Sequence, residues 1–193
     1  MPREAAIPTP PRTSLAEIIA AGRGIVETDG LERLTMQRVA AAVGVRAPSL
    51  YKHVQSRGDL VRLIVEDVAR ELGEALDAAA RTGDALSDLR AMVGAVRAFA
   101  HARPATYALL FAHLPEVSRP DLERVARGSS AVLRTATVLA GPDRALEAAR
   151  TIVAWAHGFI SMELAGAFRL GGDVDRAYTF GIQRLGAALA QAD

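Results

Sequence analysis

Apolar residues recur every three or four positions along most of the chain, the spacing that places them on one face of an α-helix. The first such run follows Ser14, and Glu17 stands three residues later, at the spacing of a capping box. We predict a first helix from Ser14 to about Gly30. Residues 1–13 contain four prolines and no such pattern, so we expect a flexible, basic arm there.

The next signals are closely spaced around Gly44. Thr35 suits the cap of a second helix that reaches about Val43, and Gly44 then interrupts the apolar pattern. Pro48 suits the first turn of a short third helix, because the N–H that proline lacks has no partner within a helix at that position. Ser56 begins a fourth helix. Helix, glycine turn and short helix together predict a helix-turn-helix, whose second helix fits the major groove of B-DNA.

Beyond residue 83 the helical pattern continues in five segments bounded mostly by glycine or proline. The predicted helices cover about residues 86–99, 107–111 and 122–139, then a long helix that reaches Gly171–Gly172, and a last one from Asp173 to about Ala190. No stretch alternates in the manner of a β-strand. We therefore expect an all-α chain of about nine helices.

The composition agrees with a helical protein. Half of the 193 residues are hydrophobic and only a twentieth are aromatic. The chain has no cysteine, which excludes disulfides and cysteine nucleophiles and fits a reducing cytoplasm. Prolines near the N-terminus do not suit a signal peptide. The most apolar stretch contains His157 and Glu163, so we expect a buried helix there and no membrane span.

The formal net charge of +1 hides a strongly basic segment. Residues 33–58 contain no aspartate or glutamate, and their basic residues are Arg33, Arg38, Arg46, Lys52 and Arg57. The segment therefore carries +5 and the rest of the chain −4. A solvated charged surface is one explanation. On a predicted helix-turn-helix, the same charge indicates binding to DNA phosphates.

The third helix has an apolar side and a polar side. Val45, Leu50 and Val54 fall on the apolar side, toward the second helix. The polar side and the N-terminal tip carry Arg46, Ala47, Pro48, Ser49, Tyr51, Lys52 and His53. The chemistry of these side chains predicts base contacts from Arg46, Ser49 and either Ala47 or Pro48. It predicts phosphate contacts from Thr35, Tyr51, Lys52 and His53.

The run LTMQRVAAAVGVRAPSLYKHVQSRGDL resembles the DNA-binding motif of the tetracycline-repressor (TetR) family of bacterial regulators. The resemblance rests on Gly-x-x-x-Leu-Thr from Gly30 to Thr35, on the Val-Ala-x-x-Val-Gly-Val hinge, and on Ser-Leu-Tyr-x-His followed by Asp-Leu. It covers about residues 14–65 and implies an all-helical homodimer with an N-terminal DNA-binding domain. It also implies base contacts from Arg46, Ala47, Ser49 and Tyr51, and phosphate contacts from Thr35, Tyr51, Lys52, His53 and Arg57.

A second resemblance lies in the later part of the chain. HARPATYALLF followed by WAHGFISMELAGAF is similar to the variant C-terminal domain of this family named for its Trp-His-Gly signature, here Trp155, His157 and Gly158. In this chain Ala156 separates the tryptophan from the histidine. The family's C-terminal domain implies ligand binding and dimerisation.

We therefore divide the chain into an arm (1–13), a helix-turn-helix domain (14–58) and a regulatory and dimerisation domain (59–193). The stretch from Thr151 to Phe168 is apolar nearly all round, so one side of its helix needs a partner beyond the monomer core. We predict that this helix and the last one pair with the same helices of a second copy. Small residues that would allow close approach are Gly158, Ala165, Gly166, Ala167, Gly186, Ala187 and Ala188. The dimer would present two recognition helices to a palindromic operator.

For a small-molecule effector we predict a pocket among the fifth to eighth helices, lined by Met92, Arg97, Phe99, Tyr107, Phe111, His113, Trp155, Phe159, Met162 and Glu163. Arg97 and Glu163 would be its polar anchors. Taken singly, each aromatic or methionine residue is explained more simply by ordinary core packing, which remains the alternative. The histidines are not at metal-ligand spacing, so we expect no metal and no cofactor. We expect His157 to be a hydrogen-bonded structural residue.

These features favour a DNA-binding transcriptional regulator, a homodimeric repressor that an effector releases from its operator. A regulator of the same type that acts without an effector, or as an activator, is the alternative. The chain lacks Gly-x-Ser-x-Gly, His-Glu-x-x-His and a phosphate-cradling loop, so we do not expect an enzyme. The expected location is the bacterial cytoplasm, at the nucleoid.

Overall fold

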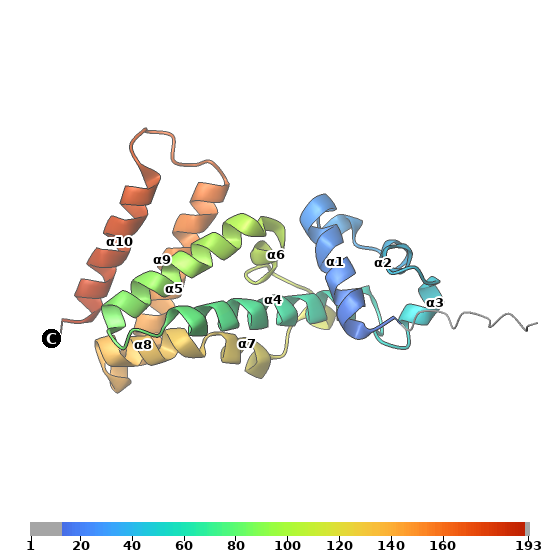
Figure 1. The fold of residues 1–193 in the computed structure, drawn as a ribbon, viewed down its shortest axis with the longest axis horizontal. Coiled ribbons are helices and arrows are strands. Elements are labelled where there is room, and N and C mark those ends of the chain that lie inside the picture. Colours follow the sequence, from blue (N-terminus) through green and yellow to red (C-terminus); the bar gives the residue numbers. More distant parts are fainter. Residues whose placement is uncertain (1–12, 192–193) are drawn as a thin grey trace, which may run out of the picture.

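A computed structural model describes residues 13–191, and residues 1–12 of the predicted arm lie outside this range. Ten α-helices form its framework (Figure 1): α1 (Leu15–Asp29), α2 (Met36–Ala42), α3 (Ala47–Leu50), α4 (Arg57–Ala79), α5 (Ala85–Ala102), α6 (Pro104–Leu109), α7 (Leu122–Gly128), α8 (Ser130–Ala140), α9 (Ala145–Leu164) and α10 (Val174–Leu189). Residues 13–191 contain no β-strand, which confirms the all-α prediction for this range. None of the helices described combines the length and apolarity needed to cross a membrane.

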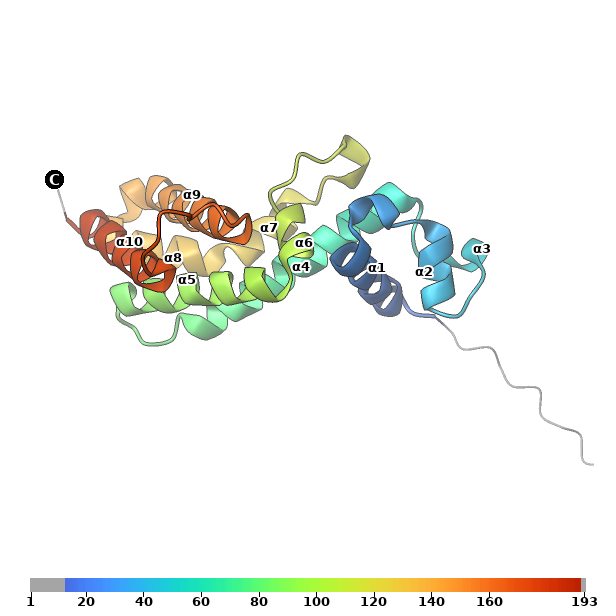
Figure 2. The same ribbon diagram turned by 90° about the horizontal axis from the view of Figure 1, so that it is seen from above.

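The helices form a small bundle and a large bundle. The small bundle consists of α1, α2 and α3 at one end of the molecule, and the large bundle holds α5 to α10 at the other (Figures 1 and 2). α4 runs between them, with its first turns packed on α1 and its later turns on α5 and α7. Ile18 and Val26 of α1 are fully buried, as are Leu60 and Ile64 of α4. One helix thus connects the two bundles through a continuous apolar core.

The predicted helix starts are confirmed at three places. Ser14 and Glu17 form both halves of a capping box, with Ser14 N–H donating to Glu17 Oε2 at 2.7 Å. The hydroxyls of Thr35 and Ser56 each accept the backbone N–H three residues on, at 3.3 Å and 3.0 Å. These caps satisfy N–H groups that have no partner inside their helices, so local sequence alone fixes the starts of α1, α2 and α4.

Gly44 makes the turn of the helix-turn-helix, as predicted. Its φ is +72°, a conformation that side chains with a Cβ disfavour. The Gly44 N–H donates to Ala41 O at 3.2 Å, and the Val45 N–H donates to Ala40 O at 2.9 Å. These two bonds form a Schellman motif, which ends α2 and redirects the chain into α3.

The predicted helix over residues 122–139 is wrong as a single element, because the structure divides it into α7 and α8 at Ser129. The cause is a backbone contact between α7 and α4. A Cβ added at Gly128 would lie 2.6 Å from Ala69 O, and one added at Gly73 would lie 2.6 Å from Gly128 Cα. This glycine contact holds the end of α7 against α4, and the break accounts for ten helices instead of about nine.

The predicted long helix that reaches Gly171–Gly172 is also wrong at its end. α9 stops at Leu164, and Gly166 follows with a φ of +62°. The Gly166 N–H donates to Glu163 O at 2.9 Å and the Ala167 N–H to Met162 O at 2.9 Å, which is a second Schellman motif. Gly166 therefore ends the helix and is not one of the small residues on a helix face that packs against a partner.

Candidate nucleic-acid interface and candidate ligand pocket

The polar segment after Gly44 lies on the surface of the small bundle, at the end of the molecule remote from α10 (Figure 1). Six of its side chains are exposed: Arg46, which is the N-cap residue of α3, Pro48, Ser49, Tyr51, Lys52 and His53. Tyr51 is 54% exposed, so its ring and hydroxyl are both accessible from outside the protein. Leu50 and Val54 are fully buried and anchor the segment to the core. The exposed side chains therefore sit on a fixed backbone.

This segment differs from the prediction in two respects. α3 ends at Leu50, so Tyr51, Lys52 and His53 stand in a turn, in which the His53 N–H donates to Leu50 O at 2.8 Å. Ala47 is half-buried and packs against the core, so its methyl group is less accessible to a base than the sequence indicated. Thr35 is exposed at the cap of α2.

Two basic side chains of the acid-free segment have structural roles that the sequence did not indicate. Arg57 donates from Nε to Leu34 O at 2.6 Å and from Nη2 to Leu31 O at 2.7 Å. It thereby fastens the connection before α2 to the start of α4. Arg38 pairs with Asp29, which lies just outside the segment. Part of the predicted +5 charge is therefore neutralised or already engaged within the protein.

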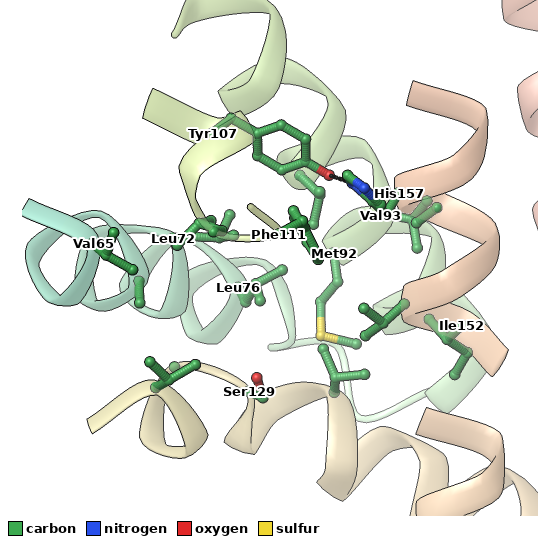
Figure 3. A pocket seen from close by; sticks show the side chains of 18 of the residues that line it. Val65, Leu72, Leu76, Met92, Val93, Tyr107, Phe111, Ser129, Ile152 and His157 are labelled. Atoms are coloured by element: carbon green, nitrogen blue, oxygen red, sulfur yellow. Dashed lines mark hydrogen bonds between the residues drawn. The ribbon is translucent and has the colours of Figure 1, made fainter. Parts of the chain in front are cut away.

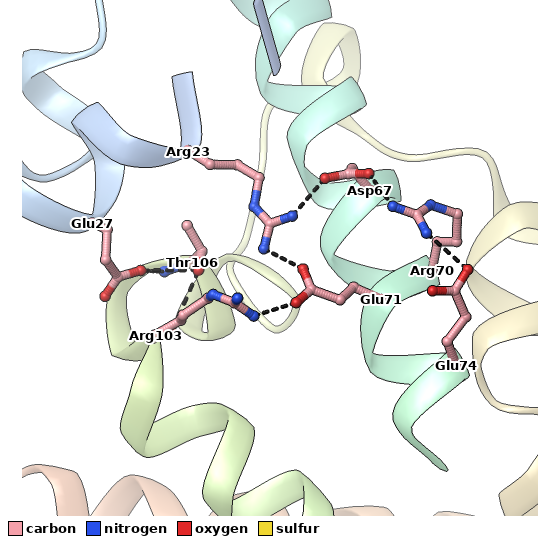
Figure 4. Close-up of polar contacts among 8 residues, drawn as sticks. All are labelled: Arg23, Glu27, Asp67, Arg70, Glu71, Glu74, Arg103 and Thr106. Carbon is pink, nitrogen blue, oxygen red and sulfur yellow. Dashed lines mark hydrogen bonds and ion pairs between the residues drawn. The ribbon is translucent and has the colours of Figure 1, made fainter. Parts of the chain in front are cut away.

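A polar seam joins the small bundle to the large one (Figure 4). Arg23 of α1 donates to Asp67 at 2.6 Å and to Glu71 at 2.5 Å, both on α4. Arg103, which precedes α6, pairs with Glu71. The seam links α1, α4 and the start of α6 through partly buried ion pairs, which are screened less by salt than fully exposed ones.

Glu27 completes the polar seam at the N-terminus of α6 (Figure 4). Its carboxylate accepts the N–H of Ala105 at 3.1 Å, the N–H of Thr106 at 3.0 Å and the Thr106 hydroxyl at 2.9 Å. The first N–H groups of a helix have no helical partner, so a carboxylate is well placed there. Glu27 and Thr106 are 79 residues apart, and no local pattern predicts their contact. The next residue, Tyr107, is buried in the large bundle.

A cavity of about 160 Å³ lies inside the large bundle, between α4 and α9 (Figure 3). Met92, Tyr107 and Phe111, three residues of the predicted pocket, line it. Most of the remaining wall is aliphatic and includes Val65, Leu72, Leu76, Val93, Val132 and Ile152. The sequence does not indicate this wall, because apolar residues at helical spacing look alike whether they face a cavity or a solid core.

Seven predicted pocket residues do not line this cavity: Arg97, Phe99, Trp155, Phe159 and Glu163, together with His113 and Met162, which are exposed. The reason is the rotation of α9. Its residues 152, 153, 156 and 157 face the cavity, whereas Trp155 and Phe159 pack against Tyr178 of α10. The predicted polar anchors are a pair outside the cavity, with Arg97 Nε donating to Glu163 Oε2 at 2.8 Å. This hydrogen bond lowers the pKa of Glu163.

Tyr107 and His157 form the polar end of the cavity (Figure 3). The Tyr107 hydroxyl lies 3.3 Å from His157 Nδ1, and the Phe111 ring stacks on the imidazole at 3.7 Å between centroids. Burial raises the pKa of Tyr107 to about 12 and lowers the pKa of His157, so both groups are neutral near pH 7. His157 is hydrogen-bonded, as predicted, but it is also part of the cavity wall.

Two protein-family descriptions match the chain. Residues 18–64 match "Bacterial regulatory proteins, tetR family", and residues 89–185 match "Tetracyclin repressor-like, C-terminal domain". The first match contains the helix-turn-helix with its exposed segment. The second contains most of α5, the helices α6 to α9 and most of α10, and with them most of the cavity wall.

Individual relatives agree with these matches. The HTH-type transcriptional regulator Rv0681 of Mycobacterium tuberculosis is 28% identical over 187 residues, which are 93% of this chain and 83% of that protein. The HTH-type transcriptional repressor DrrR1 of Streptomyces coeruleorubidus is 38% identical over 60 residues, 31% of this chain and 22% of that protein. The structure of a TetR variant from Acinetobacter baumannii in complex with minocycline superposes with a TM-score of 0.67 at 20% identity, over 91% of this chain and 96% of that chain. The helix-turn-helix, the helical C-terminal part and the matches to both together place this chain in the TetR family of bacterial transcriptional regulators.

Proposed function

We propose that the protein is a homodimeric repressor that binds a palindromic operator through α3 and the turn after it, and that a small molecule in the cavity releases it. The observation that carries the DNA-binding part is the exposed polar segment held over the buried Leu50 and Val54. The relative DrrR1, which matches part of this chain, is named a repressor, and this supports the direction of regulation. We assign DNA binding to residues 14–58 and regulation and dimerisation to residues 59–193.

The side chains proposed for DNA contact follow from position and chemistry. Arg46 and Ser49 lie at the start of α3, where an arginine fork can pair with guanine O6 and N7. Pro48 and Tyr51 complete the base-facing surface, with Ala47 in a minor role because it is half-buried. Lys52, His53 and Thr35 are placed for phosphate oxygens. Arg57 is exposed as well, but its Nε and Nη2 are bonded to backbone carbonyls, so we assign it a supporting role in place of the predicted phosphate contact.

Selection of genomic DNA fragments by the purified protein, followed by fluorescence anisotropy on the enriched sequence, tests this function. We expect the enriched sequence to be a palindrome whose half-sites lie one helical turn apart, roughly 34–36 Å. Affinity for it should fall steeply with salt, because cationic side chains release counterions from phosphates. Absence of any sequence preference at moderate salt would contradict the proposal.

The proposed dimer face lies on α9 and α10. Phe180 of α10 is 60% exposed, and Leu146 and Met162 leave further apolar surface on α9. Among the small residues predicted for this face, Gly186 is instead covered within the monomer, since a Cβ there would lie 2.9 Å from Leu86. Exposed apolar surface on the last two helices supports their pairing across a two-fold axis.

We predict that Phe180→Glu converts the dimer to a monomer at micromolar concentration, because it removes the apolar ring and places a carboxylate from each subunit in the interface, where desolvation of the charge is costly even with Arg184 of the same helix beside it. Light scattering coupled to size-exclusion chromatography measures the mass directly. Leu122→Glu is the matched control, since Leu122 is also exposed but lies on α7. If the Phe180→Glu variant remains a dimer, the dimer interface does not include this part of α10.

Communication between cavity and DNA surface has two structural routes. The first is α4, which contributes to the cavity wall and to the core of the small bundle. The second is α6, where the neighbouring residues Thr106 and Tyr107 contact Glu27 of α1 and His157 of the cavity. A ligand that displaces Tyr107 would strain the bonds between α6 and α1. The ligand can change the free energy of DNA binding only by the difference between its own binding free energies to the DNA-binding and the released conformations of the protein.

We predict that Glu27→Gln loosens the α1–α6 contact without unfolding the protein. The amide keeps one acceptor oxygen but loses the charge that favours the helix N-terminus, at a cost of about 1 kcal/mol. Hydrogen–deuterium exchange at the amides of Ala105 and Thr106 should accelerate several-fold. Glu32→Gln, which changes an exposed glutamate near the same bundle, should leave both rates unchanged. Equal acceleration in both variants would show that the carboxylate of Glu27 has no specific role.

A further inference from the structure

We propose that the cavity binds an uncharged lipophilic molecule about the size of one aromatic ring that carries a single hydroxyl or carbonyl group. This inference rests on the proposed function, because it names the chemical class of the molecule that regulates DNA binding. The lining of the cavity, its volume and its polar end at Tyr107 and His157 support it, and the hydroxyl of Ser129 is a further polar group of the wall (Figure 3).

The lining excludes charged ligands. No aspartate, glutamate, lysine or arginine is among the described residues that line the cavity. The sequence predicted two charged pocket residues, Arg97 and Glu163. They are paired with each other outside the cavity and offer no counter-charge to a ligand inside it. An ion that enters an apolar cavity without a partner loses several kcal/mol of hydration free energy that nothing restores. An organic cation or a carboxylate is therefore a poor occupant.

The volume limits the ligand. An apolar protein cavity of about 150 Å³ accommodates benzene, and the cavity here is about 160 Å³. Met92 and Phe111 contribute a sulfur and a ring to its wall, and both pack favourably against an aromatic molecule. One ring with a short substituent fills this space.

The polar end supplies the orientation. Because the Tyr107 phenol and the His157 imidazole are both neutral, they offer a hydrogen-bond donor and an acceptor without a charge. Tyr107 OH and His157 Nδ1 are 3.3 Å apart, and Ser161 Oγ lies 3.4 Å from the same nitrogen. Both contacts are long, so the Tyr107 hydroxyl is able to bond to a third atom. A hydroxyl or carbonyl oxygen placed here would gain a partner, while the ring of the ligand stays among the aliphatic side chains.

Isothermal titration calorimetry with four probes of one size tests the class on the unmodified, DNA-free protein. The probes are benzyl alcohol, toluene, benzylammonium and benzoate. We expect benzyl alcohol and toluene to bind, and each ion to bind at least about 30-fold more weakly than benzyl alcohol, since neither ion finds a counter-charge. If either ion binds as tightly as benzyl alcohol, or if no probe binds at millimolar concentration, the inference is overturned.

Two tyrosine variants locate the hydrogen bond. Tyr107→Phe should weaken the binding of benzyl alcohol about three- to tenfold, which is the range that the loss of one hydrogen bond produces. The affinity for toluene should stay unchanged. Tyr178→Phe is the matched control, because its hydroxyl is also buried but donates to Val93 O at 2.9 Å, and Tyr178 does not line the cavity. An equal effect of both variants on benzyl alcohol, or none from Tyr107→Phe, would contradict the assigned polar end. The probe ranking needs no variant and so does not depend on either one folding.

These measurements separate the two proposals. Calorimetry without DNA reports only on the cavity, and anisotropy without probe reports only on the DNA surface. A protein that binds its operator but none of the probes refutes the ligand class alone. A protein that ranks the probes as expected but shows no sequence-selective DNA binding refutes the proposed function alone.

Discussion

Replacing Arg46 with alanine is expected to weaken operator binding by about 1–3 kcal/mol for each half-site, which is roughly 5- to 150-fold per recognition surface. Arg46 is exposed at the N-cap of α3, where we propose a base contact in the major groove. Binding to unrelated DNA should change much less. Anisotropy titrations with the selected palindrome and with a scrambled duplex, at one salt concentration, measure both affinities.

The companion variant Lys52→Ala should behave differently. A phosphate contact carries no sequence information, so affinity for both duplexes should fall by a similar factor. The slope of log affinity against log salt should shrink by about one for each lysine lost. Arg81→Ala is a suitable control, because Arg81 is exposed beyond the far end of α4. If Arg46→Ala and Lys52→Ala weaken both duplexes alike, α3 does not read bases.

The second large effect concerns stability. Gly128→Ala should lower the free energy of unfolding by about 1–3 kcal/mol, the usual cost of overpacking. The added Cβ would lie 2.6 Å from the carbonyl oxygen of Ala69, a backbone atom of α4 that cannot rotate away. α7 and α4 must therefore separate. Urea unfolding followed by circular dichroism gives the change in midpoint and slope.

Gly94→Ala is the control, for which we expect the free energy of unfolding to change in the opposite direction. Gly94 lies inside α5, and apart from the nearby backbone of its own helix no heavy atom stands within 4 Å of a Cβ built there. Alanine should therefore stabilise the protein by about 0.5–1 kcal/mol, because it restricts the unfolded chain and favours the helix. A loss of stability at Gly94 comparable to that at Gly128 would show that the α4–α7 contact is not what makes glycine necessary.

Features that depend on only a few neighbouring residues were predictable from the sequence. The caps at Ser14, Thr35 and Ser56 and the turn at Gly44 depend on hydrogen bonds that reach at most five residues, and all four were predicted. The end of α9 has the same local character. Gly166 closes it with a Schellman motif, and that glycine was visible in the sequence but was taken for part of a packing face.

Features that depend on contacts between distant segments were not predictable in this way. The break at Ser129 follows from the contact of Gly128 with α4, and a glycine alone does not reveal its distant neighbour. The cavity was misplaced for a related reason. Its wall depends on the rotation of α9, and a shift of one or two positions exchanges His157 for Trp155. The same applies to Glu27, whose role appears only when α6 is placed beside α1.

Lys52 is the only lysine in the chain, and it is exposed. Apart from the α-amino group, an acylating reagent thus has a single target in this protein, and that target lies on the proposed DNA surface. Labelling followed by mass spectrometry would give a one-residue footprint. A bound duplex should slow the reaction, and a single acetyl group there would remove one positive charge from the DNA surface of each subunit.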